Sequence, residues 1–270
     1  MPNRLCILLT LTVFLIAMMT RRASQLSTHS CTTKRCIAVL ARRSPEGDFA
    51  LLHKRQHALS KLPWTNGWDH IIFHEGNISE DECGLSVRYV DVSSTFRKFQ
   101  GNMPRSSICS PTCLRQYPIG YRSMCLFWFD DFLDYISDYD EILRIDDDCC
   151  LDEGVSEPNL AADVLFASGK TQGCDVPEFT DGLEELFSRL DPTVNFSSCE
   201  HPYTNVMWVN VQWARATRGL KSAVLQSNCI QINRWGDLPL WGYFLKMLGV
   251  PIIKLPISYH HGSHDVHIYG

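Results

Sequence analysis

The sequence lacks the features that mark nucleic-acid-binding proteins and repeat proteins. It contains no long basic run, no internal repeat and no low-complexity tract. Its 25 Lys and Arg residues are outnumbered by 30 Asp and Glu residues, which gives a net charge of −5 at pH 7. Because nucleic-acid-binding domains carry a basic patch or stripe, this balance argues against a nucleic-acid partner. The 270 residues, 45% of them hydrophobic, are enough for one large domain with a sizeable core.

The chain also lacks an apolar run of about 20 residues, the length of a full transmembrane helix. Its longest apolar segment, residues 5–19, lies between Arg4 and the pair Arg21 and Arg22. Such a segment is typical of either the core of a signal peptide or a short signal-anchor. No small-x-small cleavage sequence follows the segment directly, and we favour the uncleaved anchor because of the length of the segment and the basic residues that flank it. In either case the rest of the chain is expected to enter the secretory pathway.

This interpretation divides the chain into three parts. Residues 1–22 are a cytosolic tail with the signal-anchor, residues 23–34 are a short stem, and residues 35–270 are a luminal domain. We therefore expect a type II membrane protein of the Golgi or ER, or a secreted protein if the segment is cleaved. The tripeptides that begin at Asn77 and Asn195 are acceptor sequences for N-glycosylation, which are usable only in a secreted or luminal protein.

Cysteine usage agrees with this destination. The sequence has 12 cysteines, and Cys6 lies in the apolar segment, so the other 11 would lie in the oxidising lumen, where disulfides form. An odd number leaves at least one thiol free or in an intermolecular bridge. The spacings of Cys31 and Cys36, and of Cys109 and Cys113, could suggest zinc, but no matching set of Cys and His partners follows them. Disulfides are therefore the preferred interpretation.

Hydrophobic patterning predicts an α/β fold for the luminal part. Strands are expected at residues 36–40 and 68–75 with a helix over residues 49–59 between them, and this order favours a sheet flanked by helices. Residues 85–92 could form a third strand. Farther along, the pattern predicts a final strand over residues 251–257 and helices over residues 121–135, 181–190, 205–216 and 238–248.

Three consecutive carboxylates, Asp146, Asp147 and Asp148, follow a predicted strand over residues 141–145. Alternate residues of an extended chain point the same way, so the Asp146 and Asp148 side chains would share one face. Two carboxylates on one face suit a hard divalent cation such as Mg²⁺ or Mn²⁺. The competing interpretation is a solvated acidic turn. The apolar strand before the acids and the His-rich segment over residues 259–264 favour the metal site.

Three blocks of sequence, read together, indicate a family. Residues 121–127 read Tyr-Arg-Ser-Met-Cys-Leu-Phe, and residues 143–148 read Leu-Arg-Ile-Asp-Asp-Asp. Residues 234–239 contain Arg-Trp-Gly-Asp-x-Pro, followed by Ile-Ser-Tyr-His-His at residues 257–261. In content and order these blocks resemble glycosyltransferase family 15, the fungal α-1,2-mannosyltransferases of the Golgi. The family's similar blocks are Tyr-Arg-x-Met-Cys-x-Phe, Trp-Arg-Val-Glu-Pro-Asp, Arg-Trp-Gly-Asp-Ala-Pro and Ile-Gly-Tyr-His-His.

The resemblance implies a GT-A fold, in which a mixed, mostly parallel sheet is flanked by helices in a single domain. It also implies GDP-mannose as the donor, Mn²⁺ or Mg²⁺ as the metal, and transfer of mannose to a hydroxyl of a glycan or glycoprotein with retention of configuration. The blocks extend only from residue 121 to residue 261, and the family's longer C-terminal tail is missing. Acceptor specificity is therefore not carried over.

Within these blocks the resemblance implies a set of metal ligands. Asp146 and Asp148 would anchor the ion, and His261 or His260 would supply an imidazole ligand. The ion would neutralise the charge that develops on the diphosphate leaving group. Arg144 would pair with Asp148 or with phosphate, and a strand-end salt bridge is the structural alternative.

Other residues are expected near the nucleotide. Tyr121 and Arg122 could contact it through ring stacking and phosphate charge, although core packing is the commoner role of such a tyrosine. Ala41 and Arg42 follow the first predicted strand, at the end of the sheet where a guanine or ribose would sit in this kind of fold.

The chain departs from the family at one chemically important position. Asn233 stands where the family has a Glu that is proposed as nucleophile or stabiliser, and an amide cannot act as a carboxylate nucleophile. Either the leaving phosphate deprotonates the acceptor, or Asp237 contributes, or the protein is inactive. Asp237 could also hold acceptor hydroxyls or cap the helix that follows it.

Alternative functions stay open from the sequence. A catalytically silent relative would bind a nucleotide sugar or a glycan without transfer, and an active relative could use another sugar nucleotide. A disulfide-rich extracellular Ca²⁺-binding module would use the same acids, but the chain lacks an EF-hand loop and the other blocks would be unexplained.

Overall fold

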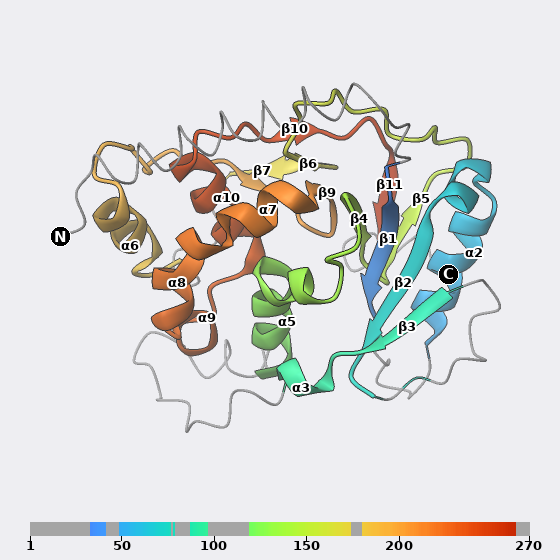
Figure 1. Ribbon diagram of the computed structural model, residues 1–270, viewed down its shortest axis with the longest axis horizontal. Coiled ribbons are helices and arrows are strands. Elements are labelled where there is room, and N and C mark those ends of the chain that lie inside the picture. The colour runs from blue at the N-terminus through green and yellow to red at the C-terminus, as the bar shows by residue number, and fades with distance from the viewer. Residues whose placement is uncertain are drawn as a thin grey trace. The chain divides into compact units, whose positions relative to one another are not determined.

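Seven strands form a mixed sheet in the computed structural model (Figure 1). The structure describes residues 33–41, 49–76, 78, 87–96, 119–173 and 180–262, and the account below concerns these residues. β9 is antiparallel to β4 and β6, and the other neighbouring strands are parallel. The predicted mixed, mostly parallel sheet is therefore confirmed. In spatial order the strands are β10 (Ile253–Lys254), β6 (Phe166–Ser168), β9 (Val206–Asn210), β4 (Glu141–Ile145), β1 (Arg35–Leu40), β2 (Asp69–His74) and β3 (Val87–Asp91).

Two short antiparallel pairs accompany the large sheet. β5 (Cys149–Leu151) pairs with β11 (Tyr259–His261), and β7 (Thr171–Gln172) pairs with β8 (His201–Pro202). Because β5 follows β4 directly, the first pair brings the end of the described chain beside the end of β4.

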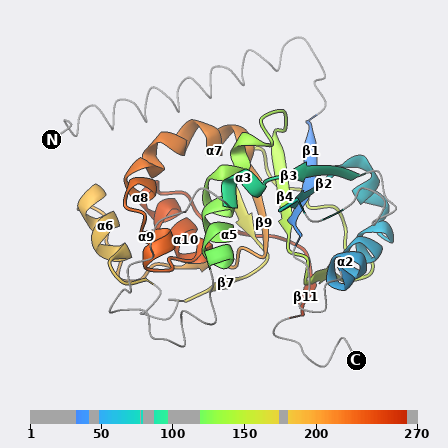
Figure 2. The ribbon, with the colours of Figure 1, turned by 90° about the horizontal axis from the view of Figure 1, so that it is seen from below.

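The helices cover both faces of the sheet, with α2 on one side and α5 and α10 on the other (Figure 2). They are α2 (Ala50–Ser60), α3 (Ser93–Phe96), α5 (Ile119–Phe129), α6 (Leu183–Leu190), α7 (Val211–Thr217), α8 (Ser222–Gln226), α9 (Cys229–Ile232) and α10 (Asp237–Met247). Short 3₁₀ helices cover Pro63–Gly67, Asp131–Asp134 and Arg218–Lys221.

Successive side chains of β1 point to opposite faces of the sheet, so this strand packs against helices on both faces. Val39 packs with Leu52 of α2, whereas Ala38 belongs to the core that includes Trp128 of α5 and Phe244 of α10. A strand covered on both faces has to be apolar on both, as β1 is. The carboxyl ends of β1 and β4 thus lie next to each other in the sheet.

The predicted helix over residues 205–216 is wrong in its first half. Residues 206–210 form β9, between β4 and β6, and only the following residues form α7. The Asn210 side chain marks the change, because its Oδ1 accepts a hydrogen bond from the Trp213 amide at 2.9 Å and caps the helix. No glycine or proline separates the two elements, so the apolar run was taken for a single helix.

Two other predicted elements are shorter than expected. The helix over residues 121–135 ends at Phe129 and gives way to a 3₁₀ turn. The last strand, expected over residues 251–257, pairs only at Ile253–Lys254. Pro251 and Pro256 lie on either side of that pair, and proline has no amide hydrogen to donate to a neighbouring strand.

Six cysteines fall in the part of the chain that the structure describes, and all six are free thiols: Cys36, Cys125, Cys149, Cys150, Cys199 and Cys229. The expected disulfides are therefore absent from this part, and the other six cysteines lie outside it. The expected membrane segment, residues 1–22, and Arg42 also lie outside the described residues. Within those residues, no helix is both long and apolar enough to cross a membrane.

A lysine is buried in the helical layer. The Lys221 ammonium group donates to the Phe129 carbonyl and lies 4.4, 4.2 and 5.2 Å from the ring centroids of Phe129, Trp241 and Phe244. Burial lowers the pKa of Lys221 to about 7, an effect that nearby Asp130 opposes. The folded state therefore holds a lysine that loses its proton more easily than it does in the unfolded chain.

We predict that this lysine makes stability depend on pH. Between pH 7 and about 10.5 the unfolded chain keeps a proton on Lys221 that the folded chain releases, so the free energy of unfolding rises with pH in this interval. Urea unfolding should show wild type gaining stability relative to Lys221→Met by up to about 1.4 kcal/mol per pH unit. A stability difference between the two proteins that is constant with pH would contradict the assignment.

Candidate active site

The acidic segment lies in a tight turn between β4 and β5. The Asp146 amide donates to the Asn205 carbonyl at 2.8 Å, and the Cys149 amide donates back to the Asp146 carbonyl at 3.1 Å. The extended geometry expected for Asp146 and Asp148 is therefore not observed, and the two side chains meet different partners. The chain turns here because β5 leaves the large sheet and pairs with β11.

Arg144, near the end of β4, links two of the predicted site residues. Its Nε and one terminal nitrogen donate to the two carboxylate oxygens of Asp146 at 2.7 and 3.0 Å. Its other terminal nitrogen donates to Asp237 Oδ2 at 2.6 Å, and the Thr204 hydroxyl donates to the same oxygen at 2.8 Å. The guanidinium also lies 4.5 Å from the ring centroid of Trp128. Arg144 thus pairs with Asp146 and Asp237 and not with Asp148, which agrees with the strand-end salt bridge considered as the structural alternative.

Burial and charge act in opposite directions on this network. Burial alone would lower the pKa of Arg144, but Asp146 and Asp237 hold it above its ordinary value, so the guanidinium stays charged. Burial raises the pKa of Asp146 despite the opposing effect of Arg144, and the charges of Asp148 and Asp237 add to the rise. Two guanidinium groups, those of Arg144 and Arg55, face the four carboxylates of Asp146, Asp147, Asp148 and Asp237, so a further cation would find a favourable potential here.

The structure brings Asp148 and His261 together, as the sequence blocks led us to expect. In the antiparallel register His261 stands opposite Cys149, and the Gly262 amide donates to the Asp148 carbonyl at 2.8 Å. His261 Nε2 lies 3.3 Å from Asp148 Oδ2, and its Nδ1 lies 3.1 Å from the Tyr203 hydroxyl. The contact with Tyr203 fixes the ring so that Nε2 faces the carboxylate.

The neighbouring His260 points elsewhere. Its Nε2 lies 3.0 Å from Asp152 Oδ1, and its side chain is about half exposed. Adjacent residues of a strand face opposite ways, so only one of the two histidines can reach the acidic turn. Of the two predicted imidazole ligands, the geometry favours His261.

Cys149 is a site residue that sequence reasoning missed. The ligand atoms of Asp148, Cys149 and His261 all lie within 4.8 Å of one another. A carboxylate, an imidazole and a thiol are donors that a divalent metal accepts, so these residues fit a metal ion. Beside them Asn205 has a buried Nδ2 with no hydrogen-bond partner in the described structure, which suits an acceptor oxygen of a bound ligand.

Arg55 was also missed. It projects from α2, is buried, and donates from Nε to the Ile145 carbonyl at 2.9 Å and from a terminal nitrogen to the Ala38 carbonyl at 3.3 Å. It therefore ties the ends of β4 and β1 together behind the acidic turn. Burial lowers the pKa of Arg55 to about 10, and the acids of the turn, Asp147 first, counter this effect.

The predicted nucleotide-contacting residues have different surroundings. Arg122 is buried and donates to the Gln231 and Ile232 carbonyls, so it holds the end of α9 against α5. The Tyr121 ring lies 5.2 Å from the Arg234 guanidinium, whose terminal nitrogen is 3.4 Å from the tyrosine hydroxyl. Ala41 is buried at the end of β1, where its amide donates to the β2 residue Phe73.

The segment between α9 and α10 carries the two predicted catalytic residues. The Asn233 side chain donates to the Asp181 carbonyl at 3.4 Å, and the Trp235 ring nitrogen donates to the same carbonyl at 2.8 Å. Gly236, not Asp237, is the N-cap of α10, so the capping role considered for Asp237 is corrected. Asp237 is only 2% exposed, and Arg144 and Thr204 both bind its carboxylate.

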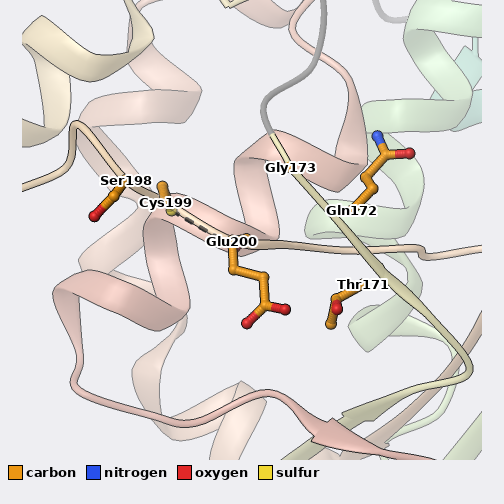
Figure 3. Close-up of a pocket in the computed structure, with 6 residues that line it drawn as sticks. All are labelled: Thr171, Gln172, Gly173, Ser198, Cys199 and Glu200. Atoms are coloured by element: carbon orange, nitrogen blue, oxygen red, sulfur yellow. Dashed lines mark hydrogen bonds between the residues drawn. The ribbon is translucent and has the colours of Figure 1, made fainter.

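An open pocket of about 370 Å³ lies along the β7–β8 pair and is lined by Thr171, Gln172, Gly173, Ser198, Cys199 and Glu200 (Figure 3). It contains none of the predicted site residues. Tyr203, which follows β8, contacts His261, so the short β7–β8 ribbon connects this pocket with the acidic turn.

Comparison with known proteins shows the fold. No protein-family model and no curated sequence matches the chain. Among solved structures, the mannosyltransferase Ktr4p from S. cerevisiae has 15% identity and a TM-score of 0.57, with 85% of this chain and 70% of that chain covered. Core-mannan synthase A from Aspergillus fumigatus, in a Mn/GDP form, has 14% identity and a TM-score of 0.62, with 87% and 76% covered. A complex of Ktr4p with GDP also matches, with 14% identity and a TM-score of 0.57. The predicted GT-A fold is confirmed, and the solved structures that share it include these mannosyltransferases.

We predict that the buried ion pair between Arg144 and Asp237 is essential for stability. Asp237→Ala leaves the guanidinium without one of its two carboxylates in a site closed to water, which should lower the free energy of unfolding by about 3–5 kcal/mol. Asp152→Ala is the control, because it breaks only the partly exposed contact with His260 and should cost less than about 1 kcal/mol. Similar losses for both variants in urea unfolding would contradict a supporting role for Asp237.

Proposed function

We propose that this chain is a metal-dependent glycosyltransferase that moves a hexose, by resemblance mannose, from GDP-mannose to a hydroxyl of a glycan or glycoprotein with retention of configuration. The observation that carries the proposal is the meeting of Asp148 and His261 at the carboxyl end of β4. Ligands of α/β sheets bind beyond the carboxyl ends of the strands. Solved structures with this fold include a Mn/GDP form and a GDP complex of mannosyltransferases, which supports the same choice of donor and metal.

Asp148 and His261 would hold the metal, with Asp146 beside them. A bound Mn²⁺ or Mg²⁺ supplies Lewis-acid neutralisation of a diphosphate leaving group. Tyr203 contributes by fixing the imidazole through Nδ1, since a ligating histidine needs its second nitrogen held. Arg144 contributes by holding Asp146 and Asp237 in place from within the core.

The surroundings of Asp237 bear on the question that the Asn233 substitution raises. A nucleophile has to reach the sugar carbon, but the Asp237 carboxylate is buried and bound by Arg144 and Thr204. Asn233 is an amide and cannot replace a carboxylate. Of the active mechanisms, we therefore favour deprotonation of the acceptor by the leaving phosphate, with Asp237 as a positioning residue that acts through Arg144.

The surroundings of the residues predicted near the nucleotide suggest a different role for each of them. Arg122 is occupied by the carbonyls at the end of α9, so we assign it to positioning that segment. Tyr121 with its partner Arg234 is the better candidate for contact with the base or the phosphates. Ala41 lies at the end of β1, and its place beside the nucleotide stays a prediction, as does that of Arg42, which lies outside the described residues.

A catalytically silent relative that binds nucleotide sugar is the second candidate. The observation that favours it is that neither Asn233 nor the enclosed Asp237 offers an exposed carboxylate where the family has a Glu. Product analysis separates the two functions, because only a transferase joins the sugar to an acceptor.

We predict that donor binding depends on the metal and on Asp148. Calorimetric titration with GDP-mannose should show binding in the presence of Mn²⁺, with at least tenfold weaker binding after chelation or in Asp148→Ala. Asp152→Ala should bind as wild type does, because this carboxylate contacts the outward-facing His260. Metal-independent binding, or equal affinity in Asp148→Ala, would argue against the proposal, and a preference for UDP-sugars would change the donor.

We also propose that the domain lies in the lumen of the Golgi or ER behind an N-terminal anchor, and this rests on the sequence. Asn195 is exposed, and its Oδ1 accepts hydrogen bonds from the Ser197 amide and hydroxyl at 3.0 and 2.8 Å. We therefore predict an N-glycan at Asn195 when the full chain is made in a eukaryotic secretory host. Endoglycosidase treatment should increase gel mobility, and Asn195→Gln should remove one glycan. A mobility that neither change affects would refute a luminal location.

A further inference from the structure

The Cys149 thiol lies on the buried side of the acidic turn. Cys149 is buried, its Sγ lies 3.9 Å from Asp148 Oδ1, and it forms one cluster with the ligand atoms of Asp148 and His261. We propose that Cys149 is the third protein ligand of the cation and that it makes this site select Zn²⁺ over Mn²⁺. This goes beyond the proposed Mn²⁺ or Mg²⁺ site, because it adds a ligand and changes the preferred metal.

The distances fit a tetrahedral ion. With zinc bonds of about 2.0–2.3 Å, neighbouring ligand atoms of a tetrahedral site lie about 3.3–3.8 Å apart. His261 Nε2 and Asp148 Oδ2 are already 3.3 Å apart, and Cys149 Sγ lies 3.9 Å from the other Asp148 oxygen. One ligand atom from each of the three residues lies within 4.8 Å of the other two, so side-chain movements of about 1 Å would bring the set to these separations. The backbone positions are held by β5 and β11, on which Cys149 and His261 stand opposite each other.

The site is closed on one side and open on the other. Cys149 is inaccessible, whereas the side chains of Asp148 and His261 are 13% and 12% exposed. An ion held by all three residues would keep a fourth position directed away from the core, which is the arrangement of catalytic zinc sites. If the proposed function holds, a diphosphate oxygen of the donor would take that position. Binding of the ion alone does not require the proposed function.

The donor atoms decide which metal is preferred. Thiolate ligands favour zinc and other soft ions, whereas carboxylate and carbonyl oxygens suit manganese and magnesium. Asp148 and His261 serve both classes of ion, so the thiolate is the discriminating group. Removing the sulfur should therefore weaken zinc binding while manganese binding persists.

Metal titrations of the full chain, freed of metal, test this inference. Cys149→Ser should raise the Kd for Zn²⁺ by about 10–100-fold and change the Kd for Mn²⁺ by less than about threefold. Cys150→Ser is the matched control, because this thiol is the next residue on β5 and faces the other way. It should leave both affinities unchanged. Co²⁺ added to wild type should give a thiolate-to-cobalt charge-transfer absorption that Cys149→Ser lacks.

The outcomes are distinguishable from one another. Unchanged zinc affinity in Cys149→Ser, or equal loss of both metals, would overturn the inference. The cobalt spectrum of wild type tests the thiolate ligand even if the variant does not fold, and absence of the charge-transfer band would also overturn it. Cys149-dependent zinc binding without GDP-mannose binding would keep the inference and remove the proposed function. Manganese-dependent donor binding without a thiolate signal would keep the proposed function and overturn the inference about Cys149.

Discussion

The antiparallel pairing of β11 with β5 is the constraint on which the candidate site depends. It extends beyond the two strands through hydrogen bonds from the Asp152 amide to the Ser258 carbonyl at 3.1 Å and from the Gly262 amide to the Asp148 carbonyl at 2.8 Å. This register sends His261 towards Asp148 and His260 towards Asp152. A slip of one residue would exchange the two histidines, so the identity of the imidazole in the site is fixed by backbone pairing.

Charge is the second determinant of the site. Asp146 and Asp237 bind Arg144, the charge of Asp148 acts on Asp146, and burial keeps solvent from screening these groups fully. Arg144 donates hydrogen bonds to Asp146 and Asp237, and its guanidinium packs over the ring of Trp128. Asp148 instead faces His261 and Cys149 at the more open side. The network therefore has a fixed, buried half that supports the fold and an accessible half that can accept a cation.

The sequence predicted those parts of the structure that depend on local pattern. The buried strands β1, β2 and β4 were recognisable from their apolar runs, and the acids at the end of β4 from the change to polar residues. The blocks shared with a transferase family predicted that the acidic turn and the C-terminal histidines would meet. That contact joins residues more than a hundred positions apart, so periodicity alone could not have supplied it.

The parts that were missed depend on tertiary context. The β9 strand runs into α7 without a glycine or proline, and only its place between β4 and β6 makes it a strand. Cys149 was grouped with the expected disulfides, because only the turn places its sulfur beside Asp148. Arg55 looked like an ordinary helix residue, since the strand ends that it joins come from distant parts of the sequence. Asp237 looked like a helix cap until the structure showed Arg144 bound to it.

The most direct test of the account is the position of the metal. A crystal of the protein grown with Mn²⁺ and GDP, measured at a wavelength where manganese scatters anomalously, locates the ion without reference to activity. The account predicts a peak bonded to both the Asp148 carboxylate and His261 Nε2, with the diphosphate beside it. A manganese peak bonded to neither residue, or a GDP site away from the end of β4, would contradict it.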